Sequence, residues 1–134
     1  MALGAASEVA VFTALRLAGY RVSVPMMDAG SPYDCVIDDG ARLQRVQIKT
    51  GYVARGAVEW SCRSTSYHRT GGTMRDYVGV ADLFAVWVPE LAQCYLVPVA
   101  ECGRHLTALR LEPSRNNQQK RVRLAADYEL RPLR

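Results

Sequence analysis

The chain has 134 residues, of which 49% are hydrophobic and 22% charged. This length and composition exclude two domains and predict one globular domain over residues 1–134. No apolar run reaches the roughly 20 residues of a membrane span, and the first residues lack the basic and apolar regions of a signal peptide. We therefore expect a cytoplasmic protein without a membrane partner. The net charge of +4 suits a polyanionic partner.

The first elements are a helix and a short strand. Residues 2–20 are rich in alanine and leucine, and their apolar side chains recur at helical spacing, so they predict a helix that ends at Gly19. Residues 20–24 then predict a strand that ends at Pro25. The turn-forming residues 26–32 predict a loop.

A hairpin follows the loop. Residues 33–38 ("YDCVID") alternate as in a strand, and residues 42–50 ("RLQRVQIKT") form a second one. The intervening "DDG" predicts a two-residue turn that pairs Asp38 with Ala41.

The remaining chain adds strands and a last helix. Further strands are predicted at residues 57–63, 83–88, 94–99 and 106–112, the last at a sheet edge. Residues 64–76 are polar and contain glycine, which predicts a mobile surface loop. Residues 120–130 predict a closing amphipathic helix. The order indicates an α/β fold, with α+β as the alternative, in which a central mixed sheet is flanked by an N-terminal and a C-terminal helix.

The positions of the cysteines predict packing in the core instead of metal binding or disulfide formation. The four cysteines are widely spaced, with no C-x-x-C pair, which argues against a zinc site and against a disulfide framework. Cys35, Cys62 and Cys94 stand in apolar strand-like runs, so we expect them to be small core residues.

Polar side chains share one face of the predicted hairpin. With a two-residue turn, Asp34 falls opposite Arg45 and diagonal to Gln47. Because strand side chains alternate between faces, these three residues and Lys49 share one face. A first helix that packs across the sheet would bring Glu8 to them.

This set of side chains fits a site for a hard cation. Asp34 offers an anionic oxygen and Gln47 a neutral one, and Mg²⁺ needs only one or two protein carboxylates besides water and phosphate. Among 17 basic residues only Lys49 and Lys120 are lysine; an ammonium is a compact charge with a tunable pKa, which arginine is not. Taken singly, each residue also has an ordinary explanation: Asp34 as a turn residue, Lys49 and Glu8 as solvated charges.

A glutamate in the first helix, then "SPYD", a short hairpin and "VQIKT" resemble the PD-(D/E)XK nuclease superfamily. The resemblance implies a restriction-endonuclease-like core. It implies a site in which Glu8, Asp34 and Gln47 hold Mg²⁺, with Mn²⁺ as a substitute, and in which Lys49 is the catalytic lysine. All four residues would then be catalytic.

The sequence departs from the family pattern in two places. One extra residue separates Pro32 from Asp34, and Gln47 replaces the usual acid. The Q-x-K form resembles small intron-associated homing endonucleases, whereas the size and early glutamate resemble archaeal-type Holliday junction resolvases.

Three functions follow from these features. The first is a metal-dependent endonuclease that resolves branched DNA such as Holliday junctions, favoured because the nuclease core has no appended specificity domain. The second is a site-specific endonuclease of the homing or restriction type, acting on duplex DNA. The third is a catalytically inactive nucleic-acid-binding module, which Gln47 favours because it removes one carboxylate.

Basic residues outside the site are candidates for DNA contacts. Residues 104–134 carry eight basic and three acidic side chains, and a second basic group lies between residues 55 and 75. Phosphate contacts of such residues release counterions and strengthen binding. The DNA-binding candidates are Arg55, Arg63, Arg69, Arg75, Arg115, Lys120 and Arg121. Because cutting two DNA strands needs two active sites, we also expect a homodimer. The apolar runs 83–88 and 94–99 are the candidate interface strands.

Overall fold

The computed structural model describes residues 3–27, 30–63, 79–103, 106–113 and 123–133. The surface loop that we expected at residues 64–76 lies outside the described residues. The helices and strands follow in this order: α1 (Leu3–Leu17), β1 (Arg21–Ser23), β2 (Cys35–Asp38), β3 (Leu43–Thr50), β4 (Tyr52–Ala54), β5 (Ala57–Ser61), β6 (Leu83–Val88), β7 (Gln93–Pro98), η2 (Val99–Glu101), β8 (Leu106–Arg110) and η3 (Ala125–Tyr128).

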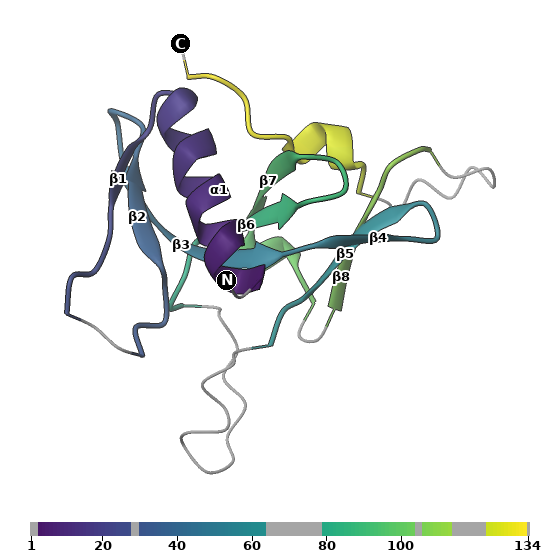
Figure 1. The fold of residues 1–134 in the computed structure, drawn as a ribbon, viewed down its shortest axis with the longest axis horizontal. Helices are drawn as coiled ribbons and strands as arrows, with labels where there is room; N and C mark the ends of the chain where they lie inside the picture. The colour runs from purple at the N-terminus through teal and green to yellow at the C-terminus, as the bar shows by residue number, and fades with distance from the viewer. Residues whose placement is uncertain (1–2, 28–29, 64–78, 104–105, 114–122, 134) are drawn as a thin grey trace.

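The strands form two sheets (Figure 1). A five-stranded sheet has the order β1-β2-β3-β6-β7, and a three-stranded sheet has the order β4-β5-β8. In the larger sheet β3 and β6 are parallel while the other neighbours are antiparallel. The central sheet is therefore mixed and the fold class is α/β, as the sequence predicted. The short β4, which pairs with β5 in the smaller sheet, was not predicted.

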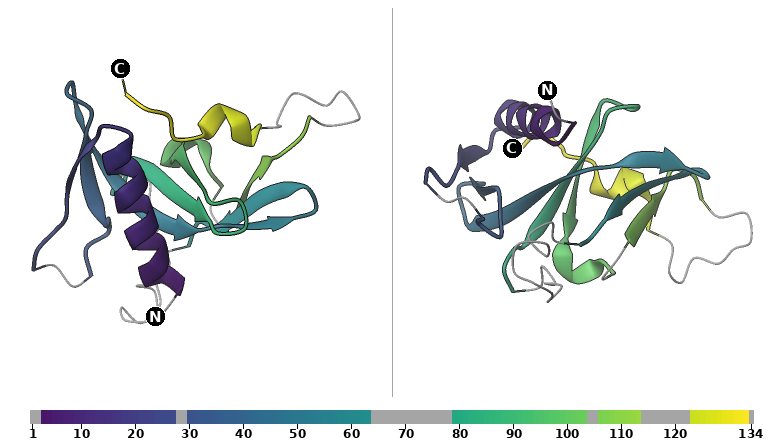
Figure 2. Two further views of the ribbon diagram at one scale, coloured as in Figure 1. Left: turned by 45° about the horizontal axis from the view of Figure 1, so that its top comes forward. Right: turned by 60° about the horizontal axis from the view of Figure 1, so that its bottom comes forward.

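Helix α1 lies across one face of the larger sheet (Figures 1 and 2). Its buried residues Ser7, Val11 and Leu15 recur every fourth position and so form a single stripe toward the sheet. The helix ends where Gly19 adopts a φ of 102°, while Tyr20 N–H donates to the Leu15 carbonyl. This pattern is a glycine C-cap. Among the described residues no helix is long and apolar enough to span a membrane.

The β2–β3 hairpin has a longer turn than we predicted. Asp38 pairs with Leu43 instead of Ala41, because the carboxylate of Asp39 accepts hydrogen bonds from the N–H groups of Ala41 and Arg42 and closes a four-residue turn. The register differs from the predicted one by two residues. Since strand side chains alternate with a period of two, this shift leaves every side chain on its predicted face.

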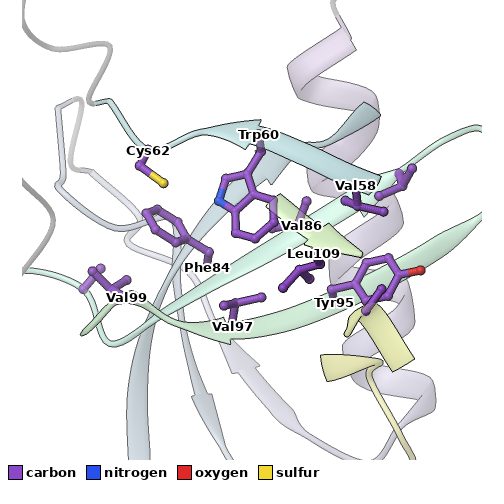
Figure 3. Packing of buried hydrophobic residues seen from close by; sticks show 12 residues of the cluster. Val58, Trp60, Cys62, Phe84, Val86, Tyr95, Val97, Val99 and Leu109 are labelled. Carbon is purple, nitrogen blue, oxygen red and sulfur yellow. The ribbon is translucent and has the colours of Figure 1, made fainter. Parts of the chain in front are cut away.

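Two apolar cores lie on opposite faces of the larger sheet. On one face, α1 packs over β2, β3 and the start of β6. On the other face, the smaller sheet packs over β6 and β7, as Figure 3 shows for Trp60 and Phe84. Their rings meet edge to face with centroids 6.3 Å apart. The smaller sheet covers only this part of the larger one.

The three cysteines in apolar runs belong to these cores. Cys35, Cys62 and Cys94 are buried free thiols, which confirms their prediction as core residues. The apolar runs 83–88 and 94–99 became β6 and β7. Most of their side chains are buried within the chain itself, Tyr95 at 3% exposure among them. These strands therefore offer little surface for the dimer interface that we expected of them.

The predicted C-terminal helix is wrong in its described part. Residues 125–128 form only the short 3₁₀ helix η3, and residues 120–122 lie outside the described residues. The backbone here pairs with strands instead of with itself: Leu130 N–H donates to the Cys94 carbonyl, and Arg110 N–H donates to the Arg123 carbonyl. Groups used in this way cannot form the hydrogen bonds of an α-helix.

Candidate active site

Asp34 joins the start of β2 to the middle of β3. Its N–H donates to the Val46 carbonyl at 2.8 Å, and its Oδ2 accepts from the N–H of Ile48 at 2.7 Å. Asp34 lies one residue before the Cys35–Val46 pair, which brings it level with Gln47 and not with Arg45, as the predicted register had it. The carboxylate thus binds the N–H of Ile48, the residue between Gln47 and Lys49.

The polar face of β3 is arranged as the sequence predicted. Gln47 and Lys49 are half-buried, and they alternate with the buried Val46 and Ile48, which face α1. The Gln47 amide nitrogen lies 3.5 Å from the carbonyl oxygen of Ile48. The Lys49 side chain reaches the chain just past the end of β5, at the border between the two sheets.

Glu8 faces Asp34 across a cavity. Both carboxylates line a cavity of about 230 Å³. Its other lining residues come from α1 and from the chain between β1 and β2: Phe12, Val24, Pro25, Gly30, Ser31 and Tyr33. A hydrogen bond of 2.6 Å between the hydroxyl groups of Ser7 and Thr50 ties this part of α1 to the end of β3. The structure therefore places Glu8 beside the same cavity as Asp34.

Burial disfavours the charged form of both carboxylates. Burial raises the pKa of Asp34, against the Ile48 N–H and the positive charge of Lys49. Burial and the negative charge of Asp34 raise the pKa of Glu8. A bound cation would reverse both effects.

Lys49 is held by a backbone carbonyl. Its Nζ donates to the carbonyl oxygen of Arg63 at 2.8 Å. Burial lowers the pKa of Lys49, while Cys62 and Asp34 act in the opposite direction. The Arg63 contact could not be predicted from the sequence, because a backbone carbonyl has the same chemistry at every position.

Arg45 shares the face of Gln47 and Lys49 but serves a different purpose. Its guanidinium and its N–H both bind the carboxylate of Asp82, with Nη2–Oδ1 at 3.1 Å and N–Oδ2 at 2.7 Å. Its Nη1 donates to the carbonyl of Gly79. These bonds fasten β3 to the start of β6, so Arg45 supports the strand that carries the site.

The donor set suits a hard cation only if other ligands complete the shell. No group of three or more histidine, cysteine, aspartate or glutamate side chains that could hold a metal occurs within the described ranges. Glu8 and Asp34 supply two carboxylates and Gln47 one neutral oxygen. Mg²⁺ keeps several waters and binds substrate phosphate, so the residues present fit this ion.

Two of the predicted DNA-binding residues are described. Arg55, at the β4–β5 turn with a φ of 50°, is exposed and lies 3.6 Å from the carboxylate of buried Glu59. Arg63 is exposed at the end of β5. The other candidates, Arg69, Arg75, Arg115, Lys120 and Arg121, lie outside the described residues.

Comparisons with known proteins agree with this geometry. The structure of the bacterial homing endonuclease I-Ssp6803I matches with a TM-score of 0.60 and 24% sequence identity, over 94% of this chain and 83% of that one. This likeness supports the restriction-endonuclease-like fold. No curated protein sequence matches the chain significantly. The profile of the PD-(D/E)XK endonuclease family matches residues 2–131, almost the whole sequence. The chain therefore belongs to the PD-(D/E)XK endonuclease family.

Proposed function

We propose that this chain is a divalent-metal-dependent endonuclease that hydrolyses phosphodiester bonds of DNA beside the cavity between Glu8 and Asp34. One observation carries the proposal. Asp34 accepts a hydrogen bond from the N–H of Ile48, the residue between Gln47 and Lys49, and lines a cavity with Glu8. Carboxylates, an amide and an ammonium thus gather at one place on the family fold.

Each residue has a distinct role in this proposal. Asp34, Glu8 and Gln47 would hold Mg²⁺, or Mn²⁺ as a substitute. A bound ion of this kind supplies Lewis acidity and lowers the pKa of water. Lys49 orients the attacking water and stabilises negative charge as it develops on the phosphate. Its lowered pKa makes proton exchange with that water easier than for an exposed lysine.

Duplex DNA cut at a specific site is the substrate we favour. The support is the similarity in fold to a bacterial homing endonuclease along most of both chains, together with the Q-x-K form of the motif. Branched DNA is the second candidate. A resolvase needs only contacts with the DNA backbone, whereas site-specific cutting also needs contacts with the bases.

Side-by-side cleavage of duplex, four-way junction, flap and single-stranded DNA with Mg²⁺ tests this proposal. We expect duplex cutting at a preferred sequence, and loss of cleavage by at least about a hundredfold in Asp34→Asn and Lys49→Ala. Both variants should fold and still bind DNA, because phosphate contacts come largely from the arginines. Preferential cutting of the junction would favour the resolvase.

The same experiment distinguishes the two endonuclease candidates from the inactive nucleic-acid-binding module. Wild-type rates in either variant would refute the site. If Mg²⁺ and Mn²⁺ affect neither cleavage nor the melting temperature of the wild type, the chain is an inactive nucleic-acid-binding module.

A further inference from the structure

We infer that Thr107 and Cys62 are positioning residues for Lys49, which they act upon through the backbone carbonyl of Arg63. The inference rests on the catalytic role proposed for Lys49. Lys49 Nζ donates to the Arg63 carbonyl at 2.8 Å. An ammonium carries three N–H donors, and the bond to this carbonyl uses one of them and helps to fix where the group lies.

The Arg63 carbonyl stands just past the end of β5. Among the described residues, the last pair of the β5–β8 ladder is Ser61 with Leu106. Beyond this pair, Arg63 N–H donates to the Ser61 hydroxyl at 3.2 Å. Cys62, which joins Arg63 to β5, therefore contributes to the position of the Arg63 carbonyl.

Cys62 fixes this segment to the core. Its side chain is 4% exposed and points toward the cluster that contains Trp60 and Phe84 (Figure 3). Its Sγ lies 2.9 Å from the hydroxyl of Thr107 on β8. The Arg63 carbonyl is thus one peptide away from a buried and hydrogen-bonded anchor.

Thr107 is a polar residue at a position where the core would accept an apolar one. It is 6% exposed, and a buried hydroxyl is costly unless it is hydrogen-bonded. Its oxygen accepts from Gly103 N–H at 3.2 Å and contacts the Cys62 thiol. The hydroxyl thereby joins β8, the chain before it and the end of β5, and it fixes the carbonyl that holds Lys49.

Amine labelling measures this contact without any cleavage assay. Lys49 and Lys120 are the only lysines of the chain, so brief acetylation followed by mass spectrometry gives the reactivity of Lys49 relative to an internal standard. In Thr107→Val we expect this ratio to rise by about threefold or more, because the ammonium loses its fixed partner. Thr107→Ser, which keeps the hydroxyl, should match the wild type.

Two further variants keep the test decisive. Leu109→Val removes one methylene from the same side of β8 and controls for a general loosening of the core; its labelling ratio should stay at the wild-type value. Cys62→Ala removes the other half of the anchor and should raise the ratio even if Thr107→Val fails to fold. An unchanged ratio in every folded anchor variant would overturn the inference.

Cleavage then shows whether the contact matters for catalysis. At saturating DNA and metal, the single-turnover rate of Thr107→Val should fall about tenfold, since small misplacements of catalytic groups are costly. DNA affinity should change by less than about twofold. A faster rate would mean that the carbonyl holds Lys49 away from its substrate, which contradicts the positioning role. If Lys49→Ala itself cleaves normally, the catalytic role proposed for Lys49 is wrong. The labelling ratio would still show whether Thr107 and Cys62 hold Lys49 in place.

Discussion

At the scale of single residues, burial disfavours the negative charge of the two carboxylates of the site, and a bound cation would favour it. Burial raises the pKa of Asp34, and burial together with Asp34 raises that of Glu8. Burial also lowers the pKa of Lys49. The shifts of Asp34 and Glu8 disfavour the ionised form that would bind a metal ion, whereas the shift of Lys49 eases the proton exchange proposed for it. Groups with perturbed pKa values are common at functional sites.

This charge cost predicts how stability depends on pH. The folded pKa of Asp34 is raised above its ordinary value of 3.8, so its ionisation costs stability as pH rises through that folded pKa. In metal-free buffer, Asp34→Asn should match the wild type below about pH 4 and exceed it in melting temperature near about pH 7. Asp82 and Asp39 have lowered pKa values. Both residues are present in the wild type and in the variant, so their contributions to the pH dependence of stability cancel in the comparison.

Thermal unfolding of both proteins in EDTA and in Mg²⁺ checks this result. Added Mg²⁺ should stabilise the wild type and leave Asp34→Asn unchanged, because only a folded site binds the ion. A difference in melting temperature that does not vary with pH would show that the Asp34 carboxylate is well solvated.

Substitutions of Gln47 test whether a neutral oxygen is sufficient to bind the metal ion at the position where the family has an acidic residue. Gln47→Glu should retain cleavage and bind Mg²⁺ more tightly, because it adds a carboxylate ligand. Gln47→Leu keeps a similar size, lacks any oxygen ligand, and should lose cleavage by about tenfold or more. Cleavage rates measured over a range of Mg²⁺ concentrations separate metal affinity from the maximal rate. If Gln47→Leu cleaves like the wild type, Gln47 is not a ligand.

At the scale of elements, Gly51 connects the two sheets. Its N–H donates to the Trp87 carbonyl at 2.8 Å, where β3 leaves the larger sheet and β4 begins. A Cβ atom at this position would lie 2.7 Å from Val86 Cγ1 and 3.2 Å from Val88 Cγ2. No side chain fits between these strands unless the core shifts.

Gly51→Ala should therefore destabilise the fold and displace Lys49, two residues before it. We expect a loss of about 1–3 kcal/mol in the free energy of unfolding, the usual cost of overpacking, and slower cleavage. Gly4→Ala is the matched control: a Cβ there meets no atom within 4 Å, and alanine favours a helix. Urea denaturation compares the two variants. Equal stability of Gly51→Ala and the wild type would mean that β3 and β6 separate easily at this point.

How far the sequence predicts an element depends on which force determines it. Period-two alternation placed Gln47 and Lys49 on one face of β3, and this result survived a turn two residues longer than expected, because the shift was even. The segment after residue 120 had an amphipathic pattern, yet its described part pairs with β7 and β8, since tertiary hydrogen bonds can override local preference. The link between Arg63 and Lys49 could not be predicted, because it depends on a backbone atom that only the fold brings near.

At the scale of the whole molecule, the number of active sites predicts the assembly. The described residues of one chain contain a single candidate set, in which Glu8 and Asp34 line one cavity and Asp34 accepts from the N–H of Ile48, the residue between Gln47 and Lys49. Cutting both strands of a duplex, or two strands of a junction, needs two such sites in one complex. We therefore predict a homodimer with two-fold symmetry, the commonest closed arrangement.

Light scattering at micromolar concentration measures this directly. We expect a mass of twice the 14.8 kDa of one chain, and cleavage on both strands within one binding event. Because β6 and β7 are mostly buried within the chain, the contact must use other surfaces. Mixing wild type with an excess of Lys49→Ala should convert paired cuts into single-strand nicks, since mixed dimers hold one working site. A stable monomer that still makes paired cuts would contradict the dimer, because a single site would then serve both strands in turn.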